Sequence, residues 1–424
     1  MSTVDLAVIA GFVVAYGLLS RKVEHSPLTG PMVFVAFGLI VGSAGFDILD
    51  LDIESAGVEV LAEATLGLLL FTDATRIDLT RLRNDVALPA RMLVLGLPLA
   101  IAIGTGLGVV LFDVPIAVAA LIAAILAPTD AALGEAVVTS EQVPVRVRQS
   151  LNVESGLNDG IALPAVAVFV ALAAEDEDFS TASSWIRFAA EQVGFGLIMG
   201  LIVGCVGALA VRGASRRSWM EGIYRQLSVL GVAVLAFTLA AHVGGNGFIA
   251  MFVGGLAFGA IARIECASVA EFTDDLAHLL AMISFIVFGA LVVGPSLDAL
   301  TWSIAIYAIA SLVVVRPLAI ALSLIGSKVR MPTVLFFGWF GPRGLASILF
   351  GIVALEEAHG TDLDIVFVVM SWTVLLSIVA HGLSAGPAAD AYGRWWSDRR
   401  EDPMQETMVE AETTELTRRR GHRS

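Results

Sequence analysis

The sequence predicts an all-α polytopic membrane protein with about 13 transmembrane helices. Three observations support this fold class. First, 57% of the 424 residues are hydrophobic and only 15% are charged, whereas soluble domains carry about 25% charged residues. Second, apolar runs of roughly 18 residues or more recur along the whole chain. Third, the polar segments between these runs alternate between basic and acidic character. This pattern excludes a soluble globular protein.

The apolar runs define the predicted spans in chain order. The first run has no preceding basic region and no small-residue cleavage site after it, so we interpret it as a retained helix rather than a signal peptide. Only the stretch VGGNG separates the eighth span from the ninth. The 13 spans cover about residues 4–20, 28–44, 56–75, 86–111, 115–138, 147–173, 188–211, 224–242, 247–262, 276–293, 299–325, 332–355 and 364–386.

The distribution of basic residues predicts the orientation. Nearly all of the 25 Lys and Arg residues follow odd-numbered spans, whereas the segments after even-numbered spans are acidic, as in FDILDLDIE and EDED. Basic segments favour the cytoplasmic side. We therefore expect a multi-pass plasma-membrane protein with its N-terminus outside, a membrane domain over residues 1–393, and a polar cytoplasmic tail over 394–424.

Two spans contain helix-breaking cores. Span five contains LAPTDAALG and span twelve contains FGPRGLAS, so each places a proline, Pro128 or Pro342, beside a charged residue. Proline removes one backbone hydrogen bond, and in lipid the freed groups must be buried in protein or line a wet cavity. Because the two spans are seven apart, they run in opposite directions. This predicts two inverted six-helix repeats joined by span seven, an arrangement found in secondary transporters.

A few ionisable side chains lie near the middle of predicted spans. Each costs roughly 2.5–3.5 kcal/mol at the bilayer centre and therefore indicates a function. Three acids and two bases leave one negative charge in excess, which suits one monovalent cation or one proton. These residues are Asp130, Glu154, Asp159, Arg316 and Arg343.

The stretch ESGLNDG of span six divides its polar groups between two helix faces. Ser155 and Asp159 are four apart and share one face, and Glu154 and Asn158 share the neighbouring face. Glu154 and Asp159 point about 140° apart at 100° per residue. We therefore predict that Asp159 and Ser155 face the ion, while Glu154 and Asn158 face a structural partner, for which Arg316 is the candidate.

Span five supplies further oxygen ligands. The break at Pro128 frees carbonyl groups beside the Thr129 hydroxyl and the Asp130 carboxylate, and such hard oxygen donors suit sodium-like ions. A cation and a proton could then compete for the Asp159 carboxylate. A buried polar network that only holds helices together is the alternative interpretation for both aspartates.

Other polar residues have structural interpretations. We expect Glu154 to be paired with a base and Arg343 to neutralise the freed helix end in span twelve. The acids of span three (Glu59, Glu63 and Asp73) lie toward its ends, where a solvated funnel explains them about as well as ion binding does. His242 and His381 lie near predicted membrane interfaces, where ordinary polar contacts are expected.

The motifs APTDAAL, ESGLNDG and GPRGLASILF, in this order on spans five, six and twelve, resemble those of NhaP-type sodium/proton antiporters of the monovalent cation/proton antiporter family. The similarity extends over roughly residues 4–386 and includes GGNGFIA and HGLSAGP. It implies a six-helix core bundle with crossed broken helices five and twelve, interleaved with dimerisation helices that form a homodimer. It also implies an essential Asp159, completed by Asp130, Thr129 and Ser155, with Glu154 nearby and tied to Arg316.

The resemblance further implies a function. The Asn158–Asp159 pair resembles the electroneutral branch, which exchanges one cation for one proton through elevator-like alternating access. We therefore expect a Na⁺ (or Li⁺)/H⁺ antiporter, with a K⁺/H⁺ antiporter as the alternative. An intramembrane aspartyl hydrolase using Asp130 and Asp159, or a channel, fits the broken inverted pair less well. The expected partners are membrane lipid and a second copy of the chain, with no enzyme activity, no cofactor and no nucleic acid.

Overall fold

The computed structural model describes residues 3–24, 26, 28–49, 55–77, 87–130, 132–174, 182–262, 270–357 and 363–398. Within these ranges all regular structure is helical, which confirms the predicted fold class. Most of the predicted tail, residues 399–424, lies outside the described residues.

The described helices form thirteen consecutive membrane-crossing segments in the predicted order. Eight are long and apolar enough to cross a bilayer as unbroken helices. The others are two short apolar helices, a helix with several charges, and the two broken spans. In chain order the elements are α1 (Thr3–Glu24), α2 (Gly30–Val41), α3 (Ala56–Arg76), α5 (Ala87–Arg91) with η1 (Met92–Gly96) and α6 (Leu97–Leu111), α7 (Ile116–Ile125) with η2 (Ala132–Gly134) and α8 (Glu135–Val138), α9 (Val145–Ala173), α10 (Ala182–Arg216), α11 (Gly222–His242), α12 (Gly247–Ile261), α14 (Ala270–Val287) with η4 (Phe288–Val293) and α15 (Gly294–Ser296), α16 (Trp302–Ala310) with η5 (Ser311–Val315) and α17 (Arg316–Ser323), α18 (Met331–Trp339) with α19 (Leu345–Glu357), and α20 (Asp364–Ser397).

The two predicted helix breaks are present and contact each other. The fifth segment leaves helical geometry after α7, and the twelfth is interrupted between α18 and α19. The backbone N–H of Asp130 in the first break donates to the carbonyl oxygen of Pro342 in the second at 2.7 Å. This bond satisfies backbone groups that neither interrupted helix can pair internally.

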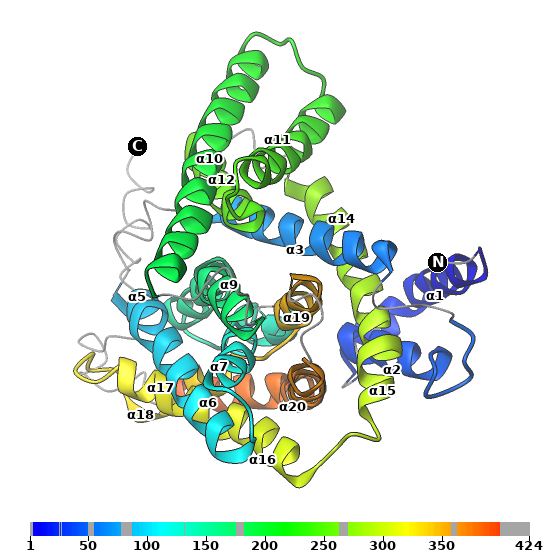
Figure 1. Cartoon of the computed structure of the whole chain (residues 1–424), viewed down its shortest axis with the longest axis vertical. Helices are drawn as coiled ribbons and strands as arrows, with labels where there is room; N and C mark the ends of the chain where they lie inside the picture. Colours follow the sequence, from blue (N-terminus) through cyan, green and yellow to red (C-terminus); the bar gives the residue numbers. More distant parts are fainter. Residues whose placement is uncertain are drawn as a thin grey trace.

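The spans pack as two groups. In one group α3 packs against α12 and α14, and α10 packs against α11 and α12. In the other, α7 packs against α6 and α9, α17 against α18, and α16 against α20. Figure 1 shows α10, α11 and α12 at one end of the molecule, with α7, α9, α19 and α20 together in the other part. The two groups meet where α9 and α19 contact α3.

Three predicted helices have ends that differ clearly from the structure. The tenth was expected to begin at 276, and α14 begins at Ala270. The seventh helix was expected over 188–211 and runs from Ala182 to Arg216, and the last was expected to end at 386 and continues to Ser397. Hydropathy locates only the apolar part of a helix, whereas strong helix formers such as Ala388 and Ala389 extend it into polar surroundings. His381, expected near an interface, therefore lies inside α20, and only 1% of it is exposed.

Candidate ion-binding site

Three predicted polar residues form one hydrogen-bonded group where the break after α7 meets α9. The hydroxyl oxygens of Thr129 and Ser155 lie 3.0 Å apart. The amide nitrogen of Asn158 donates to the Thr129 hydroxyl. All three residues are buried. The structure therefore joins the two motifs that the sequence places about 26 residues apart.

Asp159 lies beside this group with an unpaired oxygen. Its Oδ1 atom is buried and has no hydrogen-bond partner among the residues that the structure describes, and the same holds for Oδ1 of Asn158. Leaving a buried acceptor unpaired costs about 1–3 kcal/mol, and more for a charged group. Two such oxygens on adjacent residues are suited to receive a cation or, at the carboxylate, a proton.

Three further carboxylates act electrostatically on Asp159: those of Asp73, Asp130 and Glu154. From the sequence, Asp73 lies toward the end of span three, where a solvated funnel explains it about as well as ion binding does. In the structure α3 packs against α9, which brings Asp73 within electrostatic range of Asp159. Its position continues the buried stripe of Leu66 and Leu70 on α3, and this helical spacing is the signal that could have identified it.

Asp130 is held by the second helix break. Its Oδ2 atom accepts from the backbone N–H of Leu345, the first residue of α19, at 2.9 Å. The N-terminus of a helix favours a carboxylate because its N–H groups are free and its dipole is positive there. A side chain at Gly344 would collide with the Asp130 carboxylate. This contact gives a physical reason for the second glycine of GPRG.

Glu154 and Arg316 form a buried ion pair, which is the contact predicted from the sequence. Nη1 of Arg316 donates to Oε1 at 3.0 Å and Nη2 donates to Oε2 at 2.9 Å. Only about 4–5% of either side chain is exposed. The guanidinium lies directly against Gly341, where any side chain would clash with it. The pair thus joins α9, α17 and the break of the twelfth span.

Asn158 does not accompany Glu154 as the two-face division predicted. Its amide donates to the Thr129 hydroxyl, which in turn lies against the Ser155 hydroxyl. Glu154 instead accepts from Arg316. Asn158 is four residues from Glu154 but also three residues from Ser155, and both spacings make neighbours on a helix. Only the position of Thr129, which depends on tertiary packing, decides between them.

Arg343 stabilises both breaks. Its side chain is fully buried and donates to the carbonyl oxygens of Leu126 at 2.9 Å, Gly341 at 2.7 Å and Ser311 at 3.2 Å. Leu126 ends α7, and Ser311 begins the π-helical turn η5. The sequence predicted that Arg343 neutralises the freed end of span twelve. The structure extends this contact to span five and to span eleven, where Ser311 precedes Arg316.

Comparison with known proteins decides the family. A family model described as the transmembrane sodium/hydrogen exchanger matches residues 8–391. The chain belongs to the sodium/hydrogen exchanger family. This confirms the resemblance found in the motifs, and it places the chain among multi-pass membrane transporters rather than enzymes.

Several relatives of this exchanger-family chain carry names for different ions. A K(+)/H(+) antiporter NhaP from Alkalimonas amylolytica is 27% identical over 372 residues, covering 86% of this chain and 62% of that protein. A probable Na(+)/H(+) antiporter from Schizosaccharomyces pombe is 25% identical over 295 residues, covering 62% of this chain and 39% of that protein. The chain thus spans less than two thirds of the length of these relatives.

A solved structure supports the fold of this exchanger-family chain. The sodium proton antiporter MjNhaP1 from Methanocaldococcus jannaschii superposes with a TM-score of 0.76 at 20% identity. The match covers 89% of this chain and 98% of that one. At this identity the comparison establishes the shared arrangement of helices and leaves the choice of ion open.

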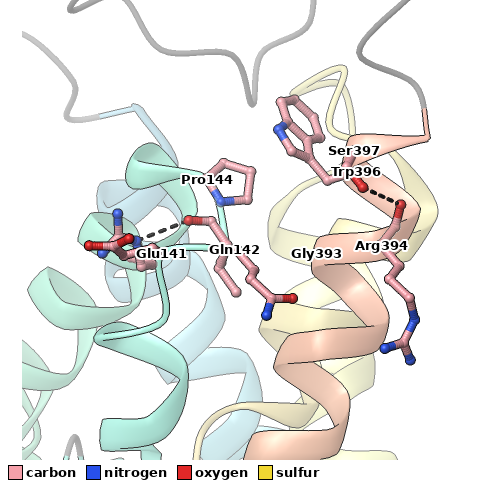
Figure 2. Close-up of a pocket in the computed structure, with 9 residues that line it drawn as sticks. Glu141, Gln142, Pro144, Gly393, Arg394, Trp396 and Ser397 are labelled. Atoms are coloured by element: carbon pink, nitrogen blue, oxygen red, sulfur yellow. Dashed lines mark hydrogen bonds between the residues drawn. The ribbon is translucent and has the colours of Figure 1, made fainter.

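A cavity of about 370 Å³ lies apart from the site, between the loop before α9 and the end of α20 (Figure 2). Gln142, Arg148 and Arg394 are among the residues that line it. The Arg148 side chain donates to the Val143 carbonyl oxygen at 3.0 Å. None of the predicted site residues lines this cavity, so the hydrogen-bonded group of Thr129, Ser155 and Asn158 is a different place in the fold.

Proposed function

We propose that the chain exchanges a monovalent cation for a proton across a membrane, with Asp159 binding each in turn. The observation that carries this proposal is the buried, unpartnered Oδ1 of Asp159 beside the unpartnered Oδ1 of Asn158, as found among the described residues. A cation satisfies both oxygens, whereas a proton neutralises the carboxylate alone. Because one group cannot hold both ligands, binding of either releases the other.

We further propose that the other predicted residues divide into ligands and supports. The Thr129 and Ser155 hydroxyls are joined to Asn158, the neighbour of Asp159 in the chain, by one hydrogen-bonded group, which suits them as cation ligands. Asp130 supplies negative charge from a position fixed by α19. Glu154, Arg316 and Arg343 serve as supports, because their charged atoms already bond to each other or to backbone carbonyl groups.

The charge balance favours electroneutral exchange. Glu154 and Arg316 neutralise each other, and Arg343 offsets one of the remaining acids within the same buried region. Among the five mid-span residues predicted from the sequence one negative charge is left, which either one monovalent cation or one proton compensates; Asp73 on α3 is a further acid outside this set. A one-for-one cycle therefore moves no net charge.

The packing supports alternating access by two bodies. Spans four to six with eleven to thirteen form the proposed six-helix core, and the remaining spans form the proposed dimerisation domain. The two bodies meet along α9 and α19 on one side and α3 and α12 on the other. An apolar crevice lined by Leu66, Leu163, Val166 and Phe248 lies at this boundary. Sliding at such an apolar surface breaks few polar contacts.

The assembly is proposed to be a homodimer in the plasma membrane, with the N-terminus outside. Large apolar side chains such as Ile202 and Val206 on α10 and Ile223 on α11 are at least half exposed. They are suited to contact lipid or a second copy of the chain.

Sodium, with lithium, is the proposed cation. The description of the family model favours sodium, whereas relatives named K(+)/H(+) antiporters make potassium the competing choice. The ligands are all oxygen atoms, which accept either ion.

Proteoliposomes with an internal fluorescent pH indicator test the proposal. Na⁺, Li⁺ and K⁺ are added in turn as chloride salts, with choline chloride as the control. We expect Na⁺ and Li⁺ to drive proton movement and choline to drive none. A stronger response to K⁺ would replace sodium by potassium, and no response to any of the three ions would contradict the exchange itself.

A further inference from the structure

His381 is buried in the middle of α20 and contacts the break of the twelfth span. Its Nε2 atom lies 2.9 Å from the backbone carbonyl oxygen of Trp339, the last residue of α18. Its ring packs on the Trp339 indole with ring centroids 4.8 Å apart. These contacts give His381 no role in binding the ion, because they are made to Trp339 at the helix break and not to Thr129, Ser155 or Asn158.

A second contact ties the other end of the break to the same turn of α20. The backbone N–H of Arg343 donates to the Ser377 hydroxyl at 2.7 Å. That hydroxyl lies 3.2 Å from Nδ1 of His381, and the Ser377 carbonyl oxygen lies 3.0 Å from the same nitrogen. Ser377 and His381 are four residues apart and therefore share one helix face.

The hydrogen-bonding roles form a directed chain. A backbone carbonyl only accepts, and each ring nitrogen has one nearby. We assign the proton to Nε2, which donates to the Trp339 carbonyl; the 3.0 Å approach of Nδ1 to the Ser377 carbonyl is then a close contact without a hydrogen bond. A neutral ring then accepts at Nδ1, where the Ser377 hydroxyl can donate. That hydroxyl in turn accepts from Arg343. The non-helical residues 340–344 are thereby attached to α20 at both ends.

The segment attached in this way is the one that positions Asp130. Pro342 accepts from the Asp130 backbone N–H, and the N–H of Leu345 donates to the Asp130 carboxylate. A displacement of the break therefore moves the negative charge that stands beside the ion site. Such a displacement would change the position of the Asp130 carboxylate without changing any residue of the site.

We propose that His381 and Ser377 form a clamp on the break between α18 and α19 and so set the position of Asp130 for cation binding. His381 is a positioning residue that acts through the break. The transport consequence rests on the proposed function, whereas the effect on the break itself does not.

A set of variants separates the clamp from simple packing. His381→Phe keeps a ring against Trp339 but can neither donate nor accept. His381→Gln keeps an amide N–H that can reach the Trp339 carbonyl. Ser377→Ala removes the hydroxyl that accepts from Arg343 and contacts Nδ1 of His381, and leaves the contact of the ring with Trp339 in place. Ser384→Ala is the matched control on α20, because Ser384 accepts from the Trp339 indole N–H, outside the break backbone.

Exchange kinetics in proteoliposomes provide the first measurement. We expect His381→Phe and Ser377→Ala to raise the cation KM about fivefold with little change in maximal rate, since a lost neutral hydrogen bond changes an equilibrium by roughly this factor. His381→Gln should restore most of the wild-type KM, and Ser384→Ala should match the wild type. An unchanged KM in His381→Phe, or a His381→Gln variant as impaired as His381→Phe, would overturn the proposal.

Amide hydrogen exchange of the purified protein provides a second measurement that needs no transport. Peptides covering residues 340–345 should take up deuterium faster in His381→Phe and Ser377→Ala than in the wild type or in Ser384→Ala. Equal uptake in all four proteins would refute the clamp. If the wild-type protein shows no exchange of any cation, the proposed function fails, and this measurement still decides whether the clamp exists. If His381→Phe does not fold, Ser377→Ala carries both measurements.

Discussion

Asp159 and Glu154 are both acids of α9, yet their surroundings give them opposite properties. Both oxygens of Glu154 accept from Arg316, so its charge is compensated within the fold. One oxygen of Asp159 has no partner among the described residues, so it is free to accept a ligand. This difference in partners, rather than burial alone, supports the proposal that Asp159 binds the transported ion.

Glu154→Gln should destabilise the protein by about 3–5 kcal/mol, because it leaves the Arg316 charge buried without its partner. Thermal unfolding of the purified protein measures this loss. Ser150→Ala on the same helix is the control, since its hydroxyl donates to the Arg146 carbonyl one turn away. A melting temperature of Glu154→Gln equal to that of the control would contradict a stabilising role for the pair.

Thr129→Val should raise the cation KM about three- to tenfold, because it keeps the side-chain volume but removes a hydroxyl oxygen from the site. Thr105→Val, which removes a hydroxyl that donates to the Ile101 carbonyl on α6, serves as the control. Initial exchange rates over a range of Na⁺ concentrations measure both. A Thr129→Val variant with the KM of Thr105→Val would remove Thr129 from the ligand set.

At this scale the sequence identified which side chains are costly in a membrane, but it did not identify all their partners. The ion pair between Glu154 and Arg316 was predictable, because each buried charge needs an opposite one. The orientation of Asn158 was not, because helical spacing allows contacts with both Ser155 and Glu154. The approach of Asp73 to Asp159 depends on which face of α3 packs against α9. That packing is a contact between distant segments, which local sequence patterns do not predict.

At the scale of elements, the position of each helix break depends on small residues as much as on proline. Pro128 and Pro342 stop the regular hydrogen bonding, and this part was predicted from the sequence. The two breaks can approach each other only because Gly341 and Gly344 leave room for the Arg316 guanidinium and the Asp130 carboxylate. The sequence shows these glycines but not the side chains that occupy the space beside them.

The contact between α9 and α12 offers a test of element packing. A Cβ atom at Gly160 would lie 2.5 Å from the Phe252 ring, whereas one at Gly156 on the same helix meets nothing within 4 Å. Gly160→Ala should therefore lower both the melting temperature and the exchange rate, because α9 must shift away from α12. Gly156→Ala should lower neither, because alanine is the better helix former and meets no obstacle there.

A second substitution in the same contact checks the cause. Phe252→Leu, combined with Gly160→Ala, removes part of the ring against which the new methyl group would press. We expect the double variant to recover part of the stability lost in Gly160→Ala. If Gly160→Ala behaves like Gly156→Ala, the close contact between the two helices has no consequence for folding or exchange.

At the scale of the whole molecule, the sequence predicted the number, order and inverted arrangement of the spans, because the bilayer requires long apolar helices with internally paired backbones. Hydropathy did not predict the helical ends that leave the bilayer, such as the last turns of α20. It also did not predict how the spans separate into two packed groups, because that division depends on contacts between distant segments.

Electroneutral exchange predicts that membrane potential does not affect the rate. A thiocyanate gradient across proteoliposomes imposes a potential without adding a second metal cation. The initial rate of Na⁺-driven proton movement should be the same with and without this gradient, because each cycle moves one positive charge in each direction. An uncoupler, which should abolish the pH signal, is the control. A rate that rises or falls with the potential would indicate unequal numbers of cations and protons.

The competition of cation and proton for Asp159 is tested most directly by comparing the wild type with Asp159→Asn in the same proteoliposome exchange assay, with size-exclusion profiles confirming that both proteins are folded. The substitution keeps the shape of the side chain but removes its charge and its ability to carry a proton. We predict that wild-type protein exchanges Na⁺ for H⁺ and that folded Asp159→Asn exchanges neither. Full exchange by Asp159→Asn would contradict the central role assigned to this carboxylate.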